Sequence, residues 1–467
     1  SISQLLSLFL VPFYTKALRP EDYGILAIVG LFTQFTNPLL SLGLDNALFR
    51  FFSLSKNVEE ERTYLTTAFF IKMTAAITCL VLIYFAYPVL DKLLFEEKLT
   101  YNIFILVLGS VFFGSFGALA EVVIRVQRKP MVFIIIQLIV MSISIVLSIY
   151  WVLILEWGVF GALLASMIGL IIRSMCLSIY LRNYLNFRYF SISQAKVLLN
   201  YALPYVPHKI QGQVMQLFSL FIVNQQMGIA SAGIYSVVNK LSKPIWMIVG
   251  SVQKAWVPYK FHLHKTESDP RAIFSSISGN YWMLLILMWS VACMMFPFIF
   301  RYLINERYHQ GINYFPFLAF IPLAQAFYFT VNTGLELRKS QKILPIATFL
   351  GMITVVSVSL ITVKYYAPYG PIIAQSLSFL VIAFITFRYA RKVLVINYPF
   401  LLTFLYLSFS SILVFINYLS GCDLLVSVIS ITIELILFIR LVQYFNEKSI
   451  GEIIRVFSSR KISLRKT

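Results

Sequence analysis

The chain has 467 residues, of which 59% are hydrophobic and only 12% are charged. Soluble domains carry about 25% charged residues, so this chain has roughly half the charge that a water-exposed surface requires. Apolar runs of about 20 residues, the length that crosses the hydrocarbon core of a bilayer, recur along the whole sequence. These features exclude a soluble helical protein and predict an all-α polytopic membrane protein.

The net charge of +19 does not indicate a nucleic-acid partner, because Lys and Arg lie in short clusters between the apolar segments. Such clusters are typical of the loops that orient membrane helices. The four cysteines are too widely spaced to indicate a metal site or a disulfide framework. We therefore expect no metal, no cofactor and no nucleic-acid partner.

In chain order, the apolar segments predict about fourteen membrane-spanning helices. Their centres fall near Leu8, Thr33, Ala76, Val111, Met141, Ile168, Gln213, Leu241, Leu287, Gln325, Val355, Leu377, Tyr406 and Glu434. The chain starts Ser-Ile-Ser, without Met, and its first apolar segment is short, so we expect the first helix to be truncated. Most Lys and Arg residues lie in the even-numbered loops and the C-terminal tail, which predicts cytoplasmic N- and C-termini.

Residues 203–261 resemble an earlier part of the chain. The copy that starts S-L-F-I-V at Ser219 and ends A-G-I-Y-S-V-V aligns with one that starts S-L-F-L-V at Ser7 and ends Y-G-I-L-A-I-V. The copies start six helices apart, an even number, so the repeat predicts two parallel six-helix lobes. We predict an N-lobe at 1–185, a C-lobe at 186–390, a further helix pair at 391–445 and a basic cytoplasmic tail at 446–467.

Basic residues inside the predicted helices indicate a cationic cavity. A charge at this depth costs at least about 2.5 kcal/mol, so each is a candidate for function. The candidates are Lys240, Lys243, Lys72, Lys209 and Arg173. A positive cavity favours an anionic cargo, because Lys and Arg compensate phosphate charge. As an alternative, Lys72, Arg173 and Lys209 lie close enough to the helix ends for their head groups to reach the membrane surface.

Polar residues follow the helices of the repeat. They either line the same cavity or form hydrogen bonds between helices. The candidates are Gln34, Asn37, Ser41, Gln213 and Gln216. Asp45 extends the first three along one face of the second predicted helix. The acids that could couple transport to an ion gradient are Asp45, Glu121 and Glu336.

Signatures of catalysis are missing from the sequence. It has no Gly-rich phosphate loop and no G-x-S-x-G, H-E-x-x-H or C-x-x-C motif. A membrane polymerase or ligase would need catalytic residues on a sizeable external loop, and the predicted external loops are short. The sequence therefore favours a transporter over an enzyme.

Five short motifs occur in order along the chain. They are L-R-P-E-D-Y-G-I-L-A at 18–27, G-L-D-N-A-L-F-R-F-F at 43–52, Y-A-L-P-Y-V-P at 201–207, A-G-I-Y-S-V-V-N-K-L at 232–241 and A-W-V-P-Y at 255–259. In these motifs the chain resembles the polysaccharide (O-antigen type) flippases of the multidrug/oligosaccharidyl-lipid/polysaccharide exporter superfamily, which includes the MATE transporters. It departs from that family at 217–223, where L-F-S-L-F-I-V replaces a common Asp-Arg pair, so no role is carried over to those positions.

The resemblance implies a flippase of a bacterial cytoplasmic membrane that works by alternating access between two lobes. Its cargo would be an undecaprenyl-diphosphate-linked oligosaccharide for surface polysaccharide such as O-antigen, capsule or exopolysaccharide. Its partners would be membrane lipids, a polysaccharide polymerase and a chain-length regulator. A cation-coupled multidrug exporter of the same architecture is the first alternative, and a membrane polysaccharide polymerase or ligase is the second.

Overall fold

The computed structural model describes residues 2–182, 184–267, 270–338 and 343–463. All regular secondary structure in these residues is helical, which confirms the predicted all-α fold. Eleven of the described helices are long and apolar enough to cross a membrane. The predicted count of about fourteen spanning helices is therefore not confirmed. Helices also form at the other predicted centres, Leu8, Gln213 and Leu241, but they are not among these eleven.

The described chain divides into two compact units. The first unit consists of residues 1–237 and 363–367, and the second of residues 238–362 and 368–467. These units do not test the predicted division into an N-lobe, a C-lobe and a further helix pair. That division stays a prediction.

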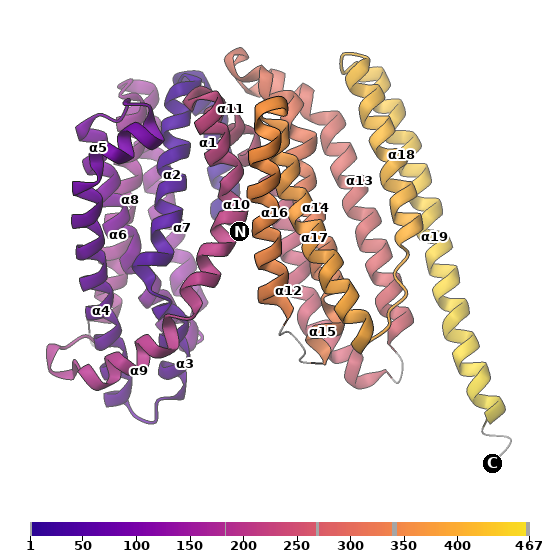
Figure 1. Cartoon of the computed structure of the whole chain (residues 1–467), viewed down its shortest axis with the longest axis horizontal. Coiled ribbons are helices and arrows are strands. Elements are labelled where there is room, and N and C mark those ends of the chain that lie inside the picture. The colour runs from indigo at the N-terminus through magenta and orange to yellow at the C-terminus, as the bar shows by residue number, and fades with distance from the viewer. Residues whose placement is uncertain (1, 183, 268–269, 339–342, 464–467) are drawn as a thin grey trace. The chain divides into compact units, whose positions relative to one another are not determined.

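The first unit contains α1 to α10 and most of α11, as labelled in Figure 1. They are α1 (Ile2–Ala17), α2 (Pro20–Ser41), α3 (Leu44–Leu54), α4 (Val58–Phe85), α5 (Tyr87–Leu90), the π-helical turn η1 (Asp91–Phe95), α6 (Tyr101–Val126), α7 (Pro130–Ile149), the π-helical turn η2 (Tyr150–Ile154), α8 (Gly158–Leu181), the 3-10 turn η3 (Phe187–Tyr189), α9 (Ile192–Ala202), α10 (Tyr205–Met227) and α11 (Ile229–Leu241), whose last residues belong to the second unit.

A break in the backbone separates α2 from α3. Leu42 and Gly43 both have positive φ, 45° and 72°, a conformation that glycine adopts without strain. A Cβ at residue 43 would also overlap the carbonyl oxygen of Ala202, so only glycine fits. The break corrects the prediction that Asp45 continues the second helix, since Asp45 lies in the first turn of α3.

Two glycines allow α2 and α11 to touch through their backbones. A Cβ on Gly24 would overlap the carbonyl oxygen of Ile229, and one on Gly233 would overlap that of Pro20. Gly24 and Gly233 occupy corresponding places at the ends of the two aligned copies. The two repeats therefore meet at equivalent positions.

The α10–α11 junction is held by η1 of the same unit. The side chain of Asn224 donates to the carbonyl oxygen of Leu94 at 2.8 Å, and that of Gln225 donates to Leu93. The carboxylate of Glu96 accepts from the backbone N–H of Ile229 at 2.8 Å. An acid at a helix N-terminus is stabilising, because it satisfies a backbone donor and complements the helix dipole.

The second unit contains the remaining helices. They are α12 (Lys243–Thr266), α13 (Arg271–Leu303), the 3-10 segment η4 (Glu306–Tyr314), α14 (Phe315–Val331), α15 (Thr333–Leu337), α16 (Leu344–Tyr366, whose last residues belong to the first unit), α17 (Tyr369–Val393), α18 (Phe400–Leu419) and α19 (Leu424–Ser463). Figure 1 shows α18 and α19 side by side next to α13. Trp282 of α13 is buried in this unit and donates to the hydroxyl of Thr330 at 3.1 Å.

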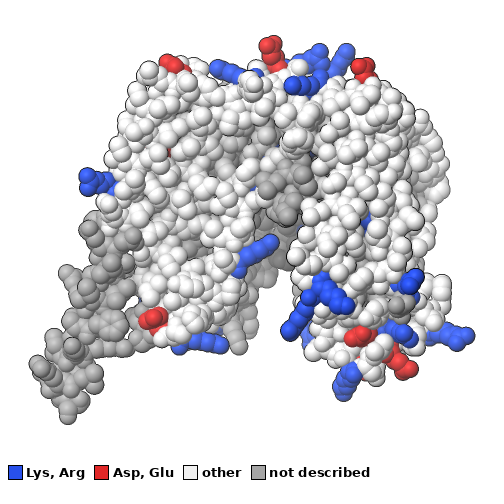
Figure 2. Space-filling view, turned by 180° about the vertical axis from the view of Figure 1, so that it is seen from behind, with Lys and Arg blue, Asp and Glu red and all other residues white. Residues whose placement is uncertain are grey.

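Charged side chains lie mainly toward the ends of the helices. Figure 2 shows most of the visible Lys, Arg, Asp and Glu toward the upper and lower ends of the view, with few charged side chains between them. This distribution is the one that a bilayer requires, because charges are costly in its apolar interior and favourable at its polar surfaces. The fold is thus that of a multi-pass membrane protein.

Candidate functional site

Three helices of the first unit bring two lysines to one carboxylate. Asp45 of α3 lies 3.5 Å from the ammonium of Lys72 on α4 and 3.3 Å from that of Lys209 on α10. The same Lys209 nitrogen lies 3.5 Å from the hydroxyl of Ser41, at the end of α2. We refer to these four residues as the Asp45 site. With one acid for two lysines, the site has one more basic than acidic side chain.

The members of the Asp45 site differ in their access to solvent. The side chain of Lys72 is 3% exposed, whereas those of Asp45 and Lys209 are 20% and 30% exposed. The Lys72 nitrogen and one Asp45 oxygen have no hydrogen-bond partner of normal geometry. Lys72 therefore forms the closed interior of the site, and Lys209 is the lysine that a ligand could reach.

A second cation of the first unit has its own acid. Arg173 of α8 lies 3.9 Å from the carboxylate of Glu121 on α6. Its guanidinium also lies 5.7 Å from the ring centre of Phe133, within range of a cation–π contact. A Cβ at Gly117 would approach this guanidinium to 3.2 Å, so the glycine makes room for the arginine. The charges of Arg173 and Glu121 balance.

The other polar residues predicted for the cavity fall in different places. Gln34 and Asn37 are exposed on α2, and Gln34 donates to the carbonyl oxygen of Gly30 in its own helix. On α10, the side-chain oxygen of Gln213 is buried without a partner, and Gln216 is exposed. Of the predicted polar residues, the Asp45 site contains Ser41.

Lys240 and Lys243, the other predicted cations, lie in the second unit. Lys240 is in the last turn of α11, and Lys243 is the first residue of α12, where Pro244 follows it. The ammonium of Lys243 lies 5.7 Å from the ring centre of Trp246. Their role as cavity cations stays a prediction.

An ion pair that the sequence analysis missed lies between α12 and α15. Lys260, which is not among the predicted cavity cations, is inside α12 with a side chain that is 2% exposed, and it pairs with Glu336. The amide of Asn332 donates to the other Glu336 oxygen at 2.7 Å. We refer to these three residues as the Glu336 site. One turn earlier, Trp256 donates to Thr333 at 3.3 Å, so the spacing of Trp256 and Lys260 was the signal for a helix face packed on α15.

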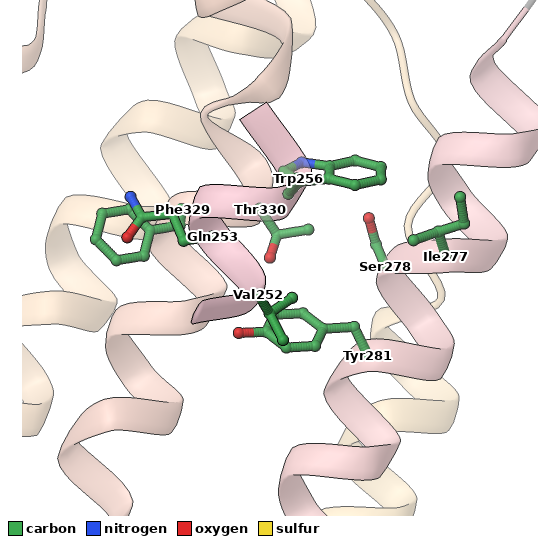
Figure 3. Close-up of a pocket in the computed structure, with 8 residues that line it drawn as sticks. All are labelled: Val252, Gln253, Trp256, Ile277, Ser278, Tyr281, Phe329 and Thr330. Atoms are coloured by element: carbon green, nitrogen blue, oxygen red, sulfur yellow. The ribbon is translucent and has the colours of Figure 1, made fainter. Parts of the chain in front are cut away.

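A small pocket lies beside the Glu336 site. Side chains of α12, α13 and α14 line it, among them the rings of Trp256, Tyr281 and Phe329 (Figure 3). Its volume is about 50 Å³. Because about 10–15 Å³ of such volume holds one water molecule, this pocket has room for a few waters.

A larger apolar groove lies on the first unit. It has a volume of about 670 Å³ and is open to the surface. Its lining residues are Leu42, Phe70, Ile71, Thr74, Ala75, Thr78, Phe187, Phe190 and Leu199. Leu42 and Ile71 are the chain neighbours of Ser41 and Lys72. The groove and the Asp45 site therefore share the α2–α3 break and the middle of α4.

Solved structures with similar folds include two kinds of membrane transporter. One, described as "Lipid II flippase MurJ, inward closed conformation", is similar with a TM-score of 0.74 and 15% identity over 97% of this chain and 98% of that chain. Another, an inward-facing multidrug resistance MATE family transporter of the MOP superfamily, has a TM-score of 0.68 and 16% identity over 84% of this chain and 94% of that chain. These low identities show the shared fold alone.

Sequence comparison adds the family. No curated protein matches the chain. A profile of the family described as "Polysaccharide biosynthesis protein" matches residues 15–278, more than half of the 467 residues, and this range includes α2, α3, α4 and α10, which build the Asp45 site. The chain belongs to this polysaccharide biosynthesis protein family.

Proposed function

We propose that the chain is a flippase that moves an undecaprenyl-diphosphate-linked oligosaccharide across a bacterial cytoplasmic membrane for surface polysaccharide biosynthesis, such as O-antigen, capsule or exopolysaccharide. The observation that carries this proposal is the Asp45 site, where Lys72 and Lys209 share one carboxylate. A diphosphate would compete with the Asp45 carboxylate for the two lysines, since ammonium groups bind phosphate oxygens as point charges.

The apolar groove supports a substrate with a lipid tail. A lipid-linked oligosaccharide combines an anionic head group with a long hydrocarbon chain, and burying each CH₂ group contributes about 0.8 kcal/mol. The groove next to the Asp45 site offers an apolar surface that includes Phe70, Ile71 and Ala75 of α4. In this proposal the diphosphate contacts the lysines and the first part of the hydrocarbon chain lies in the groove.

The family and the fold support transport rather than catalysis. The family is described by polysaccharide biosynthesis, and one similar fold belongs to a protein described as a lipid II flippase. We propose alternating access between the two predicted lobes, cytoplasmic N- and C-termini, and association with a polysaccharide polymerase and a chain-length regulator. Lys240, Lys243 and Arg173 are proposed to contribute positive charge along the path.

The decisive experiment measures translocation of a fluorescent lipid-diphosphate oligosaccharide in vesicles that contain the purified full-length chain. Lys209→Ala should slow translocation at least about tenfold, which corresponds to about 1.4 kcal/mol. Lys209→Arg should retain most of it, because the charge remains. Lys196→Ala, a change at an exposed lysine of α9, is the matched control. Equal rates for Lys209→Ala and the control would overturn the proposed role of the Asp45 site.

A cation-coupled multidrug exporter is the second candidate, and the similarity to a MATE transporter favours it. The two functions differ in the sign of the cargo, because an exporter of cationic drugs would need acids in excess. The Asp45 site has the opposite balance. If deleting the gene changed drug resistance and left surface polysaccharide unchanged, the exporter would be the better description.

A further inference from the structure

Glu434 of α19 is a fully buried acid inside a helix that is long and apolar enough to cross a membrane. Its exposed fraction is 0%, and it lies in the segment Leu424–Gln443. α19 packs on α13 and α18, all within the second unit (Figure 1). A group at this depth in hydrocarbon is costly if it is charged and unpaired, so its surroundings decide its protonation state.

The acids that the sequence analysis considered for ion coupling are all paired with cations. Asp45 contacts Lys72 and Lys209, Glu121 contacts Arg173, and Glu336 contacts Lys260. In contrast, none of the ion pairs among the described residues includes Glu434. The buried acid on α19 therefore has no described cation to stabilise a negative charge.

The neighbours of Glu434 are hydroxyl groups from two helices. Ser290 of α13 and Ser410 of α18 both donate to the carboxyl oxygen Oε1, Ser410 at 2.7 Å. The second oxygen, Oε2, is buried and has no hydrogen bond of normal geometry. The hydroxyl of Tyr406 on α18 lies beside the carboxyl and is also buried without such a bond. The remaining titratable group that faces it is the thiol of Cys293 on α13.

We propose that Glu434 is a proton-binding site that keeps its proton through the transport cycle. The proton resides on Oε2, and the neutral carboxyl joins α13, α18 and α19 through its hydrogen bonds. Ser290 and Ser410 contact Oε1 directly, and a cation such as Na⁺ at this position would have to displace these contacts. A proton needs no such space. It also satisfies Oε2, which can then donate toward the Tyr406 hydroxyl.

The proposal assigns different roles to the two carboxyl oxygens. Oε1 is the carbonyl oxygen, because it accepts two hydrogen bonds, and Oε2 carries the hydrogen. Glutamine has the same shape and reproduces this pattern, with its carbonyl at Oε1 and its NH₂ at the second position. The site therefore behaves as a fixed, neutral link between the α18–α19 pair and α13.

Infrared spectroscopy of the full-length chain in lipid nanodiscs tests the proposal. The wild type should show a carbonyl stretching band of a protonated carboxyl at neutral and mildly alkaline pH. Glu434→Gln should remove this band, whereas Glu306→Gln, a change at an exposed acid of η4, should leave it. Ser410→Ala should move the band to higher frequency, because a hydrogen bond to the carbonyl oxygen is lost.

Translocation measurements separate a resident proton from one that is exchanged. Glu434→Gln should translocate lipid-diphosphate oligosaccharide at the wild-type rate. If the proposed function fails because the wild type does not move this substrate, the same two proteins are compared with another cargo that the wild type transports. Absence of the band in the wild type, or its persistence in Glu434→Gln, would overturn the proton site. Loss of translocation in a folded Glu434→Gln protein would overturn the claim that the proton stays bound.

Discussion

The Asp45 site and the Glu336 site are built from the same residue types but differ in charge balance and access. In the first unit, Asp45 faces two lysines, one of them 30% exposed. In the second unit, Glu336 faces one lysine, which is 2% exposed, and one amide. The two carboxylates are similarly exposed, at 20% for Asp45 and 22% for Glu336, so the difference lies in the lysines. We therefore propose the Asp45 site for ligand binding, because it has a second, accessible lysine that its carboxylate shares with Lys72.

The largest expected effect concerns Lys260, the buried partner of Glu336. Lys260→Met removes the cation that compensates Glu336, and breaking one partner of a buried ion pair costs about 3 kcal/mol or more. We expect a clear decrease in the thermal unfolding midpoint of the protein in detergent, followed by tryptophan fluorescence. The double variant Lys260→Met with Glu336→Leu should recover most of the loss. A single variant as stable as the wild type would show that the pair is not formed.

A somewhat smaller effect is expected in the Asp45 site. Asp45→Asn leaves Lys72 buried beside Lys209 with no carboxylate, at a cost of about 2 kcal/mol. Added pyrophosphate should restore stability, because an anion that binds only the folded state contributes about 2.7 kcal/mol at 100 times its Kd. The measurement is the unfolding midpoint with and without pyrophosphate.

Lys260→Met serves as the comparison for that experiment, since its remaining acid should not attract an anion. If pyrophosphate stabilised both variants equally, the distinction between the two sites would be wrong.

The second unit contributes positive charge to transport in our proposal through Lys240 and Lys243. Replacing both with Ala should slow translocation about tenfold, or about 1.4 kcal/mol, if they attract the diphosphate. Protein amounts in the vesicles are measured in parallel, with Lys196→Ala as the control. Translocation at the normal rate would restrict the anion path to the first unit.

The smallest effect is expected for the Arg173–Glu121 pair, whose atoms are 3.9 Å apart and whose side chains are both partly exposed. Glu121→Gln should change the free energy of unfolding by less than about 1 kcal/mol, as for exposed ion pairs. A denaturation series in detergent measures it. A loss as large as that of Lys260→Met would mean that exposure is a poor guide to the strength of these pairs.

Hydropathy was sufficient for the class of fold, because a chain with so few charges has no alternative to membrane helices. It could not reveal the pairs that build the sites. The partners of Lys72 and Lys209 depend on the α2–α3 break at Leu42 and Gly43, which redirects Asp45.

Lys260 was missed for a related reason. Its acid, Glu336, is 76 residues away along the chain, so no local pattern connects the two. Glu434 marks the centre of the last predicted helix, yet its hydroxyl neighbours come from α13 and α18. Contacts between distant helices are set by packing, which hydropathy does not describe.

The backbone contact at Gly24 and Gly233 has a consequence for the balance of conformations. A methyl group at either position would act as a wedge between α2 and α11, because it would overlap a carbonyl oxygen of the other helix. Such a wedge destabilises only those members of the ensemble in which the helices touch, and it leaves the separated ones unaffected. Gly233→Ala would thus lower the population of every conformation in which α2 and α11 touch. A ligand that binds only such a conformation would lose affinity in proportion to the population removed.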